Sequence, residues 1–431
     1  MSEYGNIEKP APLSFSQKFM RGLALFLPGI FLLGFNLGTG SVTAMAKAGA
    51  DYGMTLLWTI VASCLCTFFM INLYGRYTLV TGETALEAFK KHIHPLVGLY
   101  FILALSLGVA GSVMGVMGIV ADICFEWSKT VIDGGIAPIW FAAVFSAMVF
   151  FIFWNGKTQF FERSLAVIVA VMSACFLINF FIMMPPPIDI LKGLIPAVPE
   201  TAADDGAGGA LLVIASMVGT TVFSGLFIIR TTLVKEAGWT LADEKTQRND
   251  ALVSVGLMFI ISASIMAAAA GTLHAAGISL TRASQMIELL EPLAGSFAVS
   301  IFAIGIIAAG VSSQFPNVLM IPWLICDYRG TERDMTLPKY RLMVFFISLL
   351  ALVVPLMGAR PVLVMIMSQA FNVMILPLTV VCIFILTNRK ALMGKHRNTL
   401  PKNIALAAIF LFSLIIAYMA IGGVVEKFGQ L

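Results

Sequence analysis

Long apolar runs separated by short polar segments dominate this sequence. Marking runs of about 18 or more apolar residues gives eleven candidate spans, centred near residues 30, 64, 110, 146, 173, 220, 262, 307, 349, 374 and 414. The runs are continuous and do not alternate between polar and apolar positions, so they predict membrane-crossing helices and not the strands of a barrel. The pattern therefore predicts an all-α membrane protein.

Composition and charge add an orientation to this prediction. Hydrophobic residues make up 59% of the 431 positions and charged residues 12%, against about 25% charged in an ordinary soluble domain. Of the 27 Lys and Arg residues, 21 fall on the side that holds the N-terminus. This bias predicts a multi-pass protein of the plasma membrane, in a prokaryote the inner membrane, with a cytoplasmic N-terminus and an external C-terminus.

The same bias accounts for the net charge of +4. The net charge therefore gives no reason to expect a nucleic-acid partner. The expected partners are the lipid bilayer and a small solute or divalent metal ion. The protein is expected to be a monomer. The six cysteines fall within or at the ends of spans, where buried small hydrophobes are expected. No nucleotide-binding loop, activated nucleophile or cysteine metal cluster is recognisable, so we expect neither an enzyme nor a cofactor.

Two spans are interrupted in matching ways. Residues 38–41, Gly-Thr-Gly-Ser, lie within the apolar stretch 23–46, and residues 219–225 similarly place Gly, Thr and Ser within 211–229. A pair of Gly-interrupted spans at equivalent places in two halves predicts a transporter site near the bilayer midplane. The alternative is that these glycines only allow close packing of helices.

The polar segments then divide the chain as follows: residues 1–18, cytoplasmic tail; 19–184, first repeat with spans 1–5; 185–208, external loop; 209–387, second repeat with spans 6–10; 388–402, cytoplasmic loop; 403–431, span 11 and the external C-terminus. Residues 81–91 are expected to form a short interfacial helix.

Six short motifs follow one another along the chain: residues 48–58 (AGADYGMTLLW), 81–83 (TGE), 161–163 (FER), 191–194 (LKGL), 368–369 (SQ) and 392–398 (LMGKHRN). In order and spacing they resemble the motifs of one family, the Nramp metal-ion transporters. The resemblance covers roughly residues 20–420. It implies the leucine-transporter fold, an inverted repeat of five plus five helices in which spans 1 and 6 are broken, followed by an eleventh span.

The chain departs from the family at the motifs that hold the metal. Where transition-metal members carry Asp-Pro-Gly-Asn, this chain has Gly38, Thr39, Gly40 and Ser41; where they carry Met-Pro-His, it has Phe223, Ser224 and Gly225. The family's acidic pair in span three falls on Ser112 and Gly115, and its second span-six histidine on Arg230. The alignment implies that acidic, imidazole and sulfur groups have been replaced.

These alignments define the expected site. The residues expected to bind the solute are Gly38, Thr39, Gly40, Ser41, Thr220, Phe223, Ser224, Gly225, Gln369 and Asn372, of which Ser41, Thr220 and Gln369 are the candidate metal ligands. The residues expected to line the pathway or to gate it are Asn36, Ser112, Arg230, Ser312 and Ser313. Arg230 is expected to pair with a cytoplasmic acid such as Glu236 or to extend to the interface.

Three functions fit this site. The first is transport of a hydrated or weakly selected metal cation of the Mg²⁺/Mn²⁺ class, because neutral oxygens can hold such an ion through its waters. No proton coupling is expected, since membrane proton relays use Asp, Glu and His, and residues 22–46, 54–74 and 97–121 contain none; a relay through Asp51 or Asp122 is the alternative. The second is transport of an amino acid or another small organic solute bound by backbone amides at the breaks. The third is a homologue that transports nothing.

Overall fold

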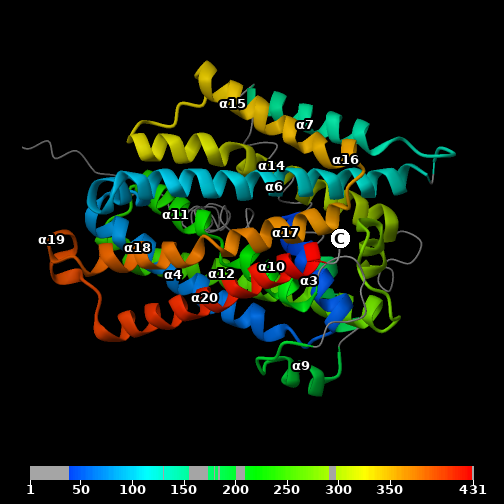
Figure 1. Ribbon diagram of the computed structural model, residues 1–431, viewed down its shortest axis with the longest axis horizontal. Coiled ribbons are helices and arrows are strands. Elements are labelled where there is room, and N and C mark those ends of the chain that lie inside the picture. The colour runs from blue at the N-terminus through cyan, green and yellow to red at the C-terminus, as the bar shows by residue number, and fades with distance from the viewer. Residues whose placement is uncertain are drawn as a thin grey trace, which may run out of the picture.

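The computed structural model describes residues 38–129, 131–154, 173–178, 180–182, 185–199, 209–290 and 298–429. Within these ranges the chain is helical and contains no strand, and most of its long helices run along one direction of an elongated bundle (Figure 1). The all-α prediction is therefore confirmed.

In chain order the helices and helical turns are α3 (Thr39–Tyr52), α4 (Leu57–Thr81), α5 (Ala85–Ala88), η1 (Phe89–Ile93), α6 (Pro95–Ser128), α7 (Pro138–Trp154), α9 (Pro187–Gly193), α10 (Ala210–Thr221), α11 (Ser224–Glu236), η2 (Leu241–Asp243), α12 (Glu244–Ala269), η3 (Ala270–His274), η4 (Ala283–Leu290), α14 (Ala298–Arg329), α15 (Pro338–Leu349), η6 (Leu350–Leu352), α16 (Val353–Met357), α17 (Pro361–Val373), α18 (Leu376–Asn388), α19 (Lys390–Met393), η7 (Gly394–His396) and α20 (Leu400–Gly429).

Eight helical stretches among the described residues are long and apolar enough to cross a membrane. They coincide with the spans predicted near residues 64, 110, 220, 262, 307, 349, 374 and 414. The span predicted near residue 146 is α7, whose 17 residues fall just short of this length. The spans predicted near residues 30 and 173 lie largely outside the described residues.

Both predicted interruptions coincide with helix boundaries. Gly38 is extended, with φ −84° and ψ −177°, and α3 begins at the next residue. Between α10 and α11, Val222 leaves the helical region at φ −103° and ψ 56°, and Phe223 is extended. A third division, between α17 and α18, has a local cause: Pro377 has no N–H to donate to the carbonyl one turn earlier.

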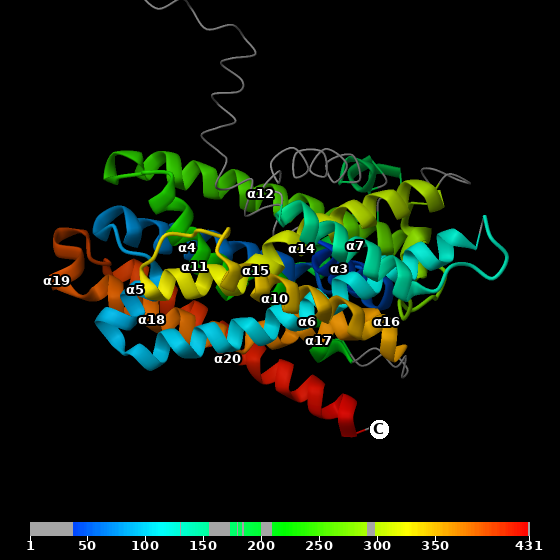
Figure 2. The same cartoon turned by 90° about the horizontal axis from the view of Figure 1, so that it is seen from above.

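The interrupted helices occupy the middle of the bundle. Every residue of α3 except Asp51 is buried, as is every residue of α10 except Leu211, and α11 is buried from Ser224 to Thr231. A helix that is apolar on all sides belongs inside a protein or in lipid, and here α4, α12 and α17 pack around α3 and α10. The last helix, α20, packs against α10 and α18 and leaves much of its surface exposed at one side of the bundle (Figure 2).

Two local predictions can be compared with the structure. The interfacial segment begins later than expected, because Gly82, at φ +70°, ends α4 and the new helix starts at Ala85. Left-handed φ favours glycine, which lacks the β-carbon that would clash there. All six cysteines are free thiols; Cys175 is half-buried and the other five are buried, as predicted.

Candidate functional site at the helix breaks

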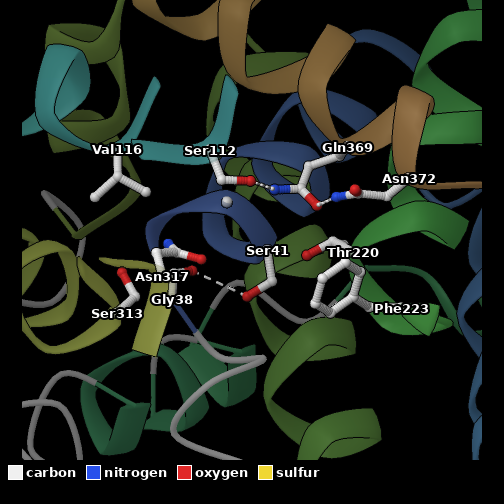
Figure 3. Close-up of a pocket in the computed structure, with 11 residues that line it drawn as sticks. Gly38, Ser41, Ser112, Val116, Thr220, Phe223, Ser313, Asn317, Gln369 and Asn372 are labelled. Carbon is white, nitrogen blue, oxygen red and sulfur yellow. Dashed lines mark hydrogen bonds between the residues drawn. The ribbon is translucent and has the colours of Figure 1, made fainter. Parts of the chain in front are cut away.

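A cavity of about 40 Å³ lies beside the start of α3 and the end of α10 (Figure 3). Its lining residues come from five parts of the chain and are Gly38, Gly40, Ser41, Ser112, Val116, Thr220, Phe223, Ser313, Asn317, Gln369 and Asn372. A cavity needs roughly 10–15 Å³ to hold one water, so this one has room for about three.

The first wall is the N-terminus of α3. The Gly38 carbonyl accepts hydrogen bonds from the Ser41 and Val42 amides, at 3.1 and 3.3 Å, and from the Ser41 hydroxyl at 3.0 Å. No side chain caps this end, and the amides of Thr39 and Gly40 have no acceptor within the helix. The positive end of the helix dipole therefore lies beside the cavity.

The second wall is the break between α10 and α11, which contributes Thr220 and Phe223. A carbonyl at the end of α10 is satisfied from outside its own helix, because the Thr67 hydroxyl of α4 donates to the Thr221 oxygen at 2.8 Å. The Phe223 ring packs against Gly225, where a β-carbon would approach the ring to 2.6 Å. The break is thus held by contacts with neighbouring residues.

A chain of polar side chains connects α17 with α6 at the third wall (Figure 3). Asn372 Nδ2 donates to Gln369 Oε1 at 3.4 Å, and Gln369 Nε2 lies 3.5 Å from Ser112 Oγ. Ser112 and Ser368 share a hydrogen bond of 3.1 Å, and Ser368 donates to the Gly108 carbonyl at 3.0 Å. Since the Ser368 hydrogen goes to Gly108, Ser112 is the donor to Ser368.

Gly108 and Asn372 fit closely within this wall. A β-carbon on Gly108 would lie 2.0 Å from Asn372 Oδ1. That oxygen is buried and has no hydrogen-bond partner among the described residues. The small residue at position 108 therefore makes room for the Asn372 amide.

The fourth wall is α14, which contributes Ser313 and Asn317. These residues are four apart and so lie on the same helix face. The Ser313 hydroxyl donates to the Gly310 carbonyl at 3.1 Å. Asn317 and Val116 were not predicted from the sequence; the spacing of Asn317 from Ser313 was the signal available for it, whereas an apolar Val116 in span three gave none.

The structure brings together nine of the predicted site residues: Gly38, Gly40, Ser41, Ser112, Thr220, Phe223, Ser313, Gln369 and Asn372. It does not place Thr39, Ser224, Gly225, Ser312 or Arg230 in the cavity wall. Ser224 is wholly buried and accepts a hydrogen bond from the Thr379 hydroxyl at 2.8 Å. Asn36 lies outside the described residues.

Arg230 differs most from expectation. It neither pairs with Glu236 nor reaches the interface; its guanidinium is wholly buried and lies 2.5 Å from Asp250 of α12. Glu236 instead pairs with Arg333 at 3.3 Å. Arg230 thus pairs with an acid, as expected, but with Asp250 and not Glu236, because α12 begins at Glu244 and places Asp250 on a helix beside α11.

The cavity wall is electrically neutral. Among the described residues that line it, none carries a carboxylate, an imidazole or a sulfur atom. No group of three or more His, Cys, Asp or Glu side chains in the described part of the chain is placed to hold a metal ion. Hydroxyl and amide groups, together with the end of α3, are what the site offers to a solute.

Two kinds of comparison with known protein sequences identify the same kind of protein. Residues 30–422 match the family model described as natural resistance-associated macrophage protein-like. The divalent metal cation transporter MntH of Deinococcus radiodurans is 25% identical over 368 residues, 82% of this chain and 79% of that protein. MntH of Erwinia tasmaniensis is 22% identical over 404 residues, 93% of each chain.

Solved structures agree on the fold. The Eremococcus coleocola manganese transporter, crystallised with an aromatic bis-isothiourea compound, superposes with a TM-score of 0.72 at 17% identity, covering 97% of this chain and 89% of that one. MhsT in complex with L-phenylalanine gives 0.62 at 16% identity, covering 93% and 98%. The predicted leucine-transporter fold is thereby confirmed, and since the family match spans most of the sequence, this multi-pass membrane protein belongs to the Nramp family.

Proposed function

We propose that this protein transports a divalent metal cation through the cavity at the helix breaks. The observation that carries the proposal is the chemistry of the cavity wall. The Ser41 and Ser313 hydroxyls both donate to carbonyls of their own helix, so that their oxygen lone pairs are what remain for a solute. Hard cations prefer such oxygen ligands.

Gln369 supports the same assignment. Its amide nitrogen is directed to Ser112 and to the Met365 sulfur, at 3.5 and 3.4 Å. Its oxygen accepts one hydrogen bond from Asn372 and keeps a second lone pair. Ser41, Thr220 and Gln369 remain the proposed ligands. The family relatives named as divalent metal cation transporters favour a cation of this charge.

The size of the cavity limits how many waters a bound cation can keep. Room for about three waters suits a cation that has exchanged part of its hydration shell for protein oxygens. A complete octahedral water shell would need a wider cavity. Without a thioether or thiolate among the lining residues there is no strong preference for softer metals, so we propose weak selection between Mg²⁺ and Mn²⁺.

We further propose that transport proceeds without protons. No group that titrates near neutral pH lines the described cavity, and neither of the alternative carriers, Asp51 and Asp122, is among its lining residues; Asp51 forms an ion pair with Lys47. Purified protein in liposomes loaded with a pH-sensitive dye tests this. Cation entry should leave the internal pH unchanged when the membrane potential is clamped; stoichiometric acidification would refute the proposal.

Ligand binding is tested by thermal shift with Mg²⁺, Mn²⁺ and Ca²⁺. A cation at 100 times its dissociation constant should raise stability by about 2.7 kcal/mol. Ser41→Ala and Gln369→Ala should abolish most of that rise, whereas Ser146→Ala, which removes a buried hydroxyl on α7 away from the cavity, should keep it. If no divalent cation shifts the unfolding temperature of the wild type, the metal assignment is wrong.

One observation favours a second function, transport of a small organic anion such as an amino acid. The uncapped end of α3 presents the Thr39 and Gly40 amides beside the cavity, and helix N-termini bind carboxylates. A panel of amino acids in the same thermal-shift assay separates the two functions. Gly40→Ala should suppress binding of an anion, because its β-carbon would lie 2.8 Å from Gln369 Nε2 and narrow the approach to these amides.

A further inference from the structure

An apolar groove lies between α18 and α20, apart from the cavity at the helix breaks. Its volume is about 190 Å³, and its lining residues are Val380, Val381, Phe384, Leu406, Ala407 and Phe410. Val380 and Leu406 are buried at its floor, whereas Phe384 and Ala407 are exposed, so the groove opens at the surface. Both helices belong to stretches apolar enough to cross a membrane, and this part of the surface therefore lies within the bilayer.

Hydrocarbon is the occupant that suits this lining. No residue that lines the groove carries a polar side chain, and water occupies a cavity only where polar groups can hold it. An empty groove loses the dispersion contacts that a closely packed structure makes. The bilayer supplies acyl chains at this depth, and one of them would fill the groove.

One end of the groove is closed by a pair of amides. Asn388 lies one turn beyond Phe384 on α18, and Asn403 lies one turn before Ala407 on α20. Their side chains exchange hydrogen bonds of 3.0 and 2.8 Å. The chain between them passes through α19 and η7, and Figure 1 shows α19 at this end of the bundle. The groove therefore ends beside the loop that joins α18 to α20.

This loop carries positive charge without acidic partners. Residues 389–402 contain no Asp or Glu and five basic residues, Arg389, Lys390, Lys395, Arg397 and Lys402. None of the five forms an ion pair with an acid in the described part of the chain. The first four are exposed. The loop thus offers unpaired cations to an anion at the end of the groove.

Lys402 connects the charge to the groove. It is half-buried and lies one turn before Leu406, on the side of α20 that lines the groove. The acid whose charge acts on it is Glu244, and Arg76 already pairs with that carboxylate at 3.0 Å. Lys402 therefore stands at the junction of the apolar groove and the basic loop.

We propose that the groove binds an anionic phospholipid, with an acyl chain between α18 and α20 and the phosphate at Lys402 and Arg389. A phospholipid joins an apolar chain directly to an anionic group, which is the arrangement that groove and loop present together. Lys and Arg form short, strong hydrogen bonds with phosphate oxygens. The loop is predicted to be cytoplasmic, and the cytoplasmic leaflet presents anionic lipid to basic pockets between helices.

Photo-crosslinking tests both parts of this site. Phosphatidylglycerol and phosphatidylcholine with the same diazirine-bearing acyl chain are added separately to the purified whole chain in detergent. Phosphatidylglycerol should crosslink to residues 380–384 and 406–410 at a concentration at least tenfold lower than phosphatidylcholine does. Crosslinks confined to other helices, or equal crosslinking by the two lipids, would overturn the proposal.

A charge variant tests the headgroup contact. Lys402→Gln should weaken the binding of phosphatidylglycerol, measured by native mass spectrometry, about fivefold, equivalent to ~1 kcal/mol for one basic residue. It should leave phosphatidylcholine unaffected, and Lys402→Arg should keep the wild-type affinity. The matched control is Lys339→Gln, which removes an exposed cation at the start of α15, across the bundle from α20 in Figure 1. Equal losses in Lys402→Gln and Lys339→Gln would show that only the overall charge matters and would refute the site.

A second variant tests the acyl-chain contact. Ala407→Trp fills the groove and should abolish crosslinking to residues 380–384. Ala408→Trp introduces the same ring at an exposed position of α20 outside the groove lining and should leave crosslinking unchanged. If Ala407→Trp does not fold, Ala407→Leu should lower crosslinking by a smaller factor. Unchanged crosslinking in a folded Ala407 variant would reject the groove as the binding site.

The same spectra identify another occupant. If the wild type is a dimer that Ala407→Trp dissociates, a second copy of this chain covers the groove and the proposal is wrong. Neither measurement needs a metal ion, so a failure of cation binding in the thermal-shift experiment leaves the lipid result interpretable.

Discussion

The carbonyl oxygen of Gln369 in α17 lies 1.8 Å from the position that a β-carbon would occupy on Gly219 of α10. The two backbones are therefore in direct contact at the cavity wall, and no residue larger than glycine fits at position 219 without moving one helix. This contact places the Gln369 side chain opposite the end of α10. Gly219, beside the predicted break, thus allows α10 and α17 to pack closely and keeps the Gln369 side chain at the cavity.

Gly219→Ala should force α10 and α17 apart. We expect a loss of about 2–3 kcal/mol of stability, as for overpacked cores, and a loss of cation-dependent stabilisation because Gln369 is displaced. Thermal unfolding with and without Mn²⁺ measures both. The matched control is Gly256→Ala on α12, where a β-carbon meets nothing within 4 Å; it should be neutral or stabilise by up to about 1 kcal/mol. Equal effects of the two substitutions would contradict the packing argument.

A double-mutant cycle tests the contact between Gly108 and Asn372. Gly108→Ala should displace the Asn372 amide, whose oxygen occupies the space of the new β-carbon, and so break its hydrogen bond to Gln369. Adding Asn372→Ala removes the clash. The double variant should therefore be more stable than the sum of the single effects predicts, with a coupling of about 1 kcal/mol or more. Strict additivity in thermal or denaturant unfolding would argue against this packing.

Phe223→Met should change metal preference. It places a thioether at the cavity wall, and a soft ligand favours a soft cation such as Cd²⁺ over the hard Mg²⁺. The ratio of dissociation constants for Mg²⁺ and Cd²⁺, measured by titration of the purified protein, should shift toward Cd²⁺ by tenfold or more. Phe227→Met introduces the same group at a buried position of α11 outside the cavity and should leave the ratio unchanged. A shift in both variants would place the effect outside the cavity.

Glu83 gives the clearest pH dependence. Burial raises its pKa, but hydrogen bonds from Lys91, His92 and Tyr77, at 2.6, 2.7 and 3.0 Å, outweigh burial and hold the pKa below its usual value of 4.5. A carboxyl whose pKa is lower in the folded state adds stability above its unfolded pKa and loses that contribution as the pH falls through its folded pKa.

Glu83→Gln should therefore lower stability near neutral pH by about 1–2 kcal/mol. The difference from wild type should shrink as the pH falls below 4.5, the usual value for this carboxyl. Unfolding temperatures measured between neutral and acidic pH give both quantities. Glu87→Gln, which breaks a more exposed pair with Lys235, should cost well under 1 kcal/mol. A difference that stays constant down to low pH would exclude ionised Glu83 as its source.

Part of the site could be predicted from sequence because helix interruptions are a local property. Gly38 and Ser41 stand in a run that is otherwise apolar, and they do line the cavity. Ser224 and Gly225 carried the same local signal, but the turn of α11 directs Ser224 to Thr379 and packs Gly225 under the Phe223 ring. Which side of a half-helix faces the cavity depends on its neighbours.

The burial of charged side chains could likewise not be predicted from the sequence alone. From the sequence, Lys47 and Asp250 appear at the margins of apolar runs, where water is the expected environment. In the structure each is buried in an ion pair, with Asp51 or with Arg230. Burial of a charge is decided by whether a partner is brought within reach, and Asp250 and Arg230 come from different helices.

The sequence alone determined that the protein is helical, spans a membrane and breaks two equivalent helices near their middle, because hydropathy and glycine placement act over a few turns of chain. Only the tertiary structure decided that Ser112, Ser313, Asn317, Gln369 and Asn372 meet around one neutral cavity. Those residues come from three helices, α6, α14 and α17, which are far apart in the chain. They meet because close approaches such as Gly219 to Gln369 fix how the helices cross, and such contacts depend on how helices pack rather than on the pattern along any one of them.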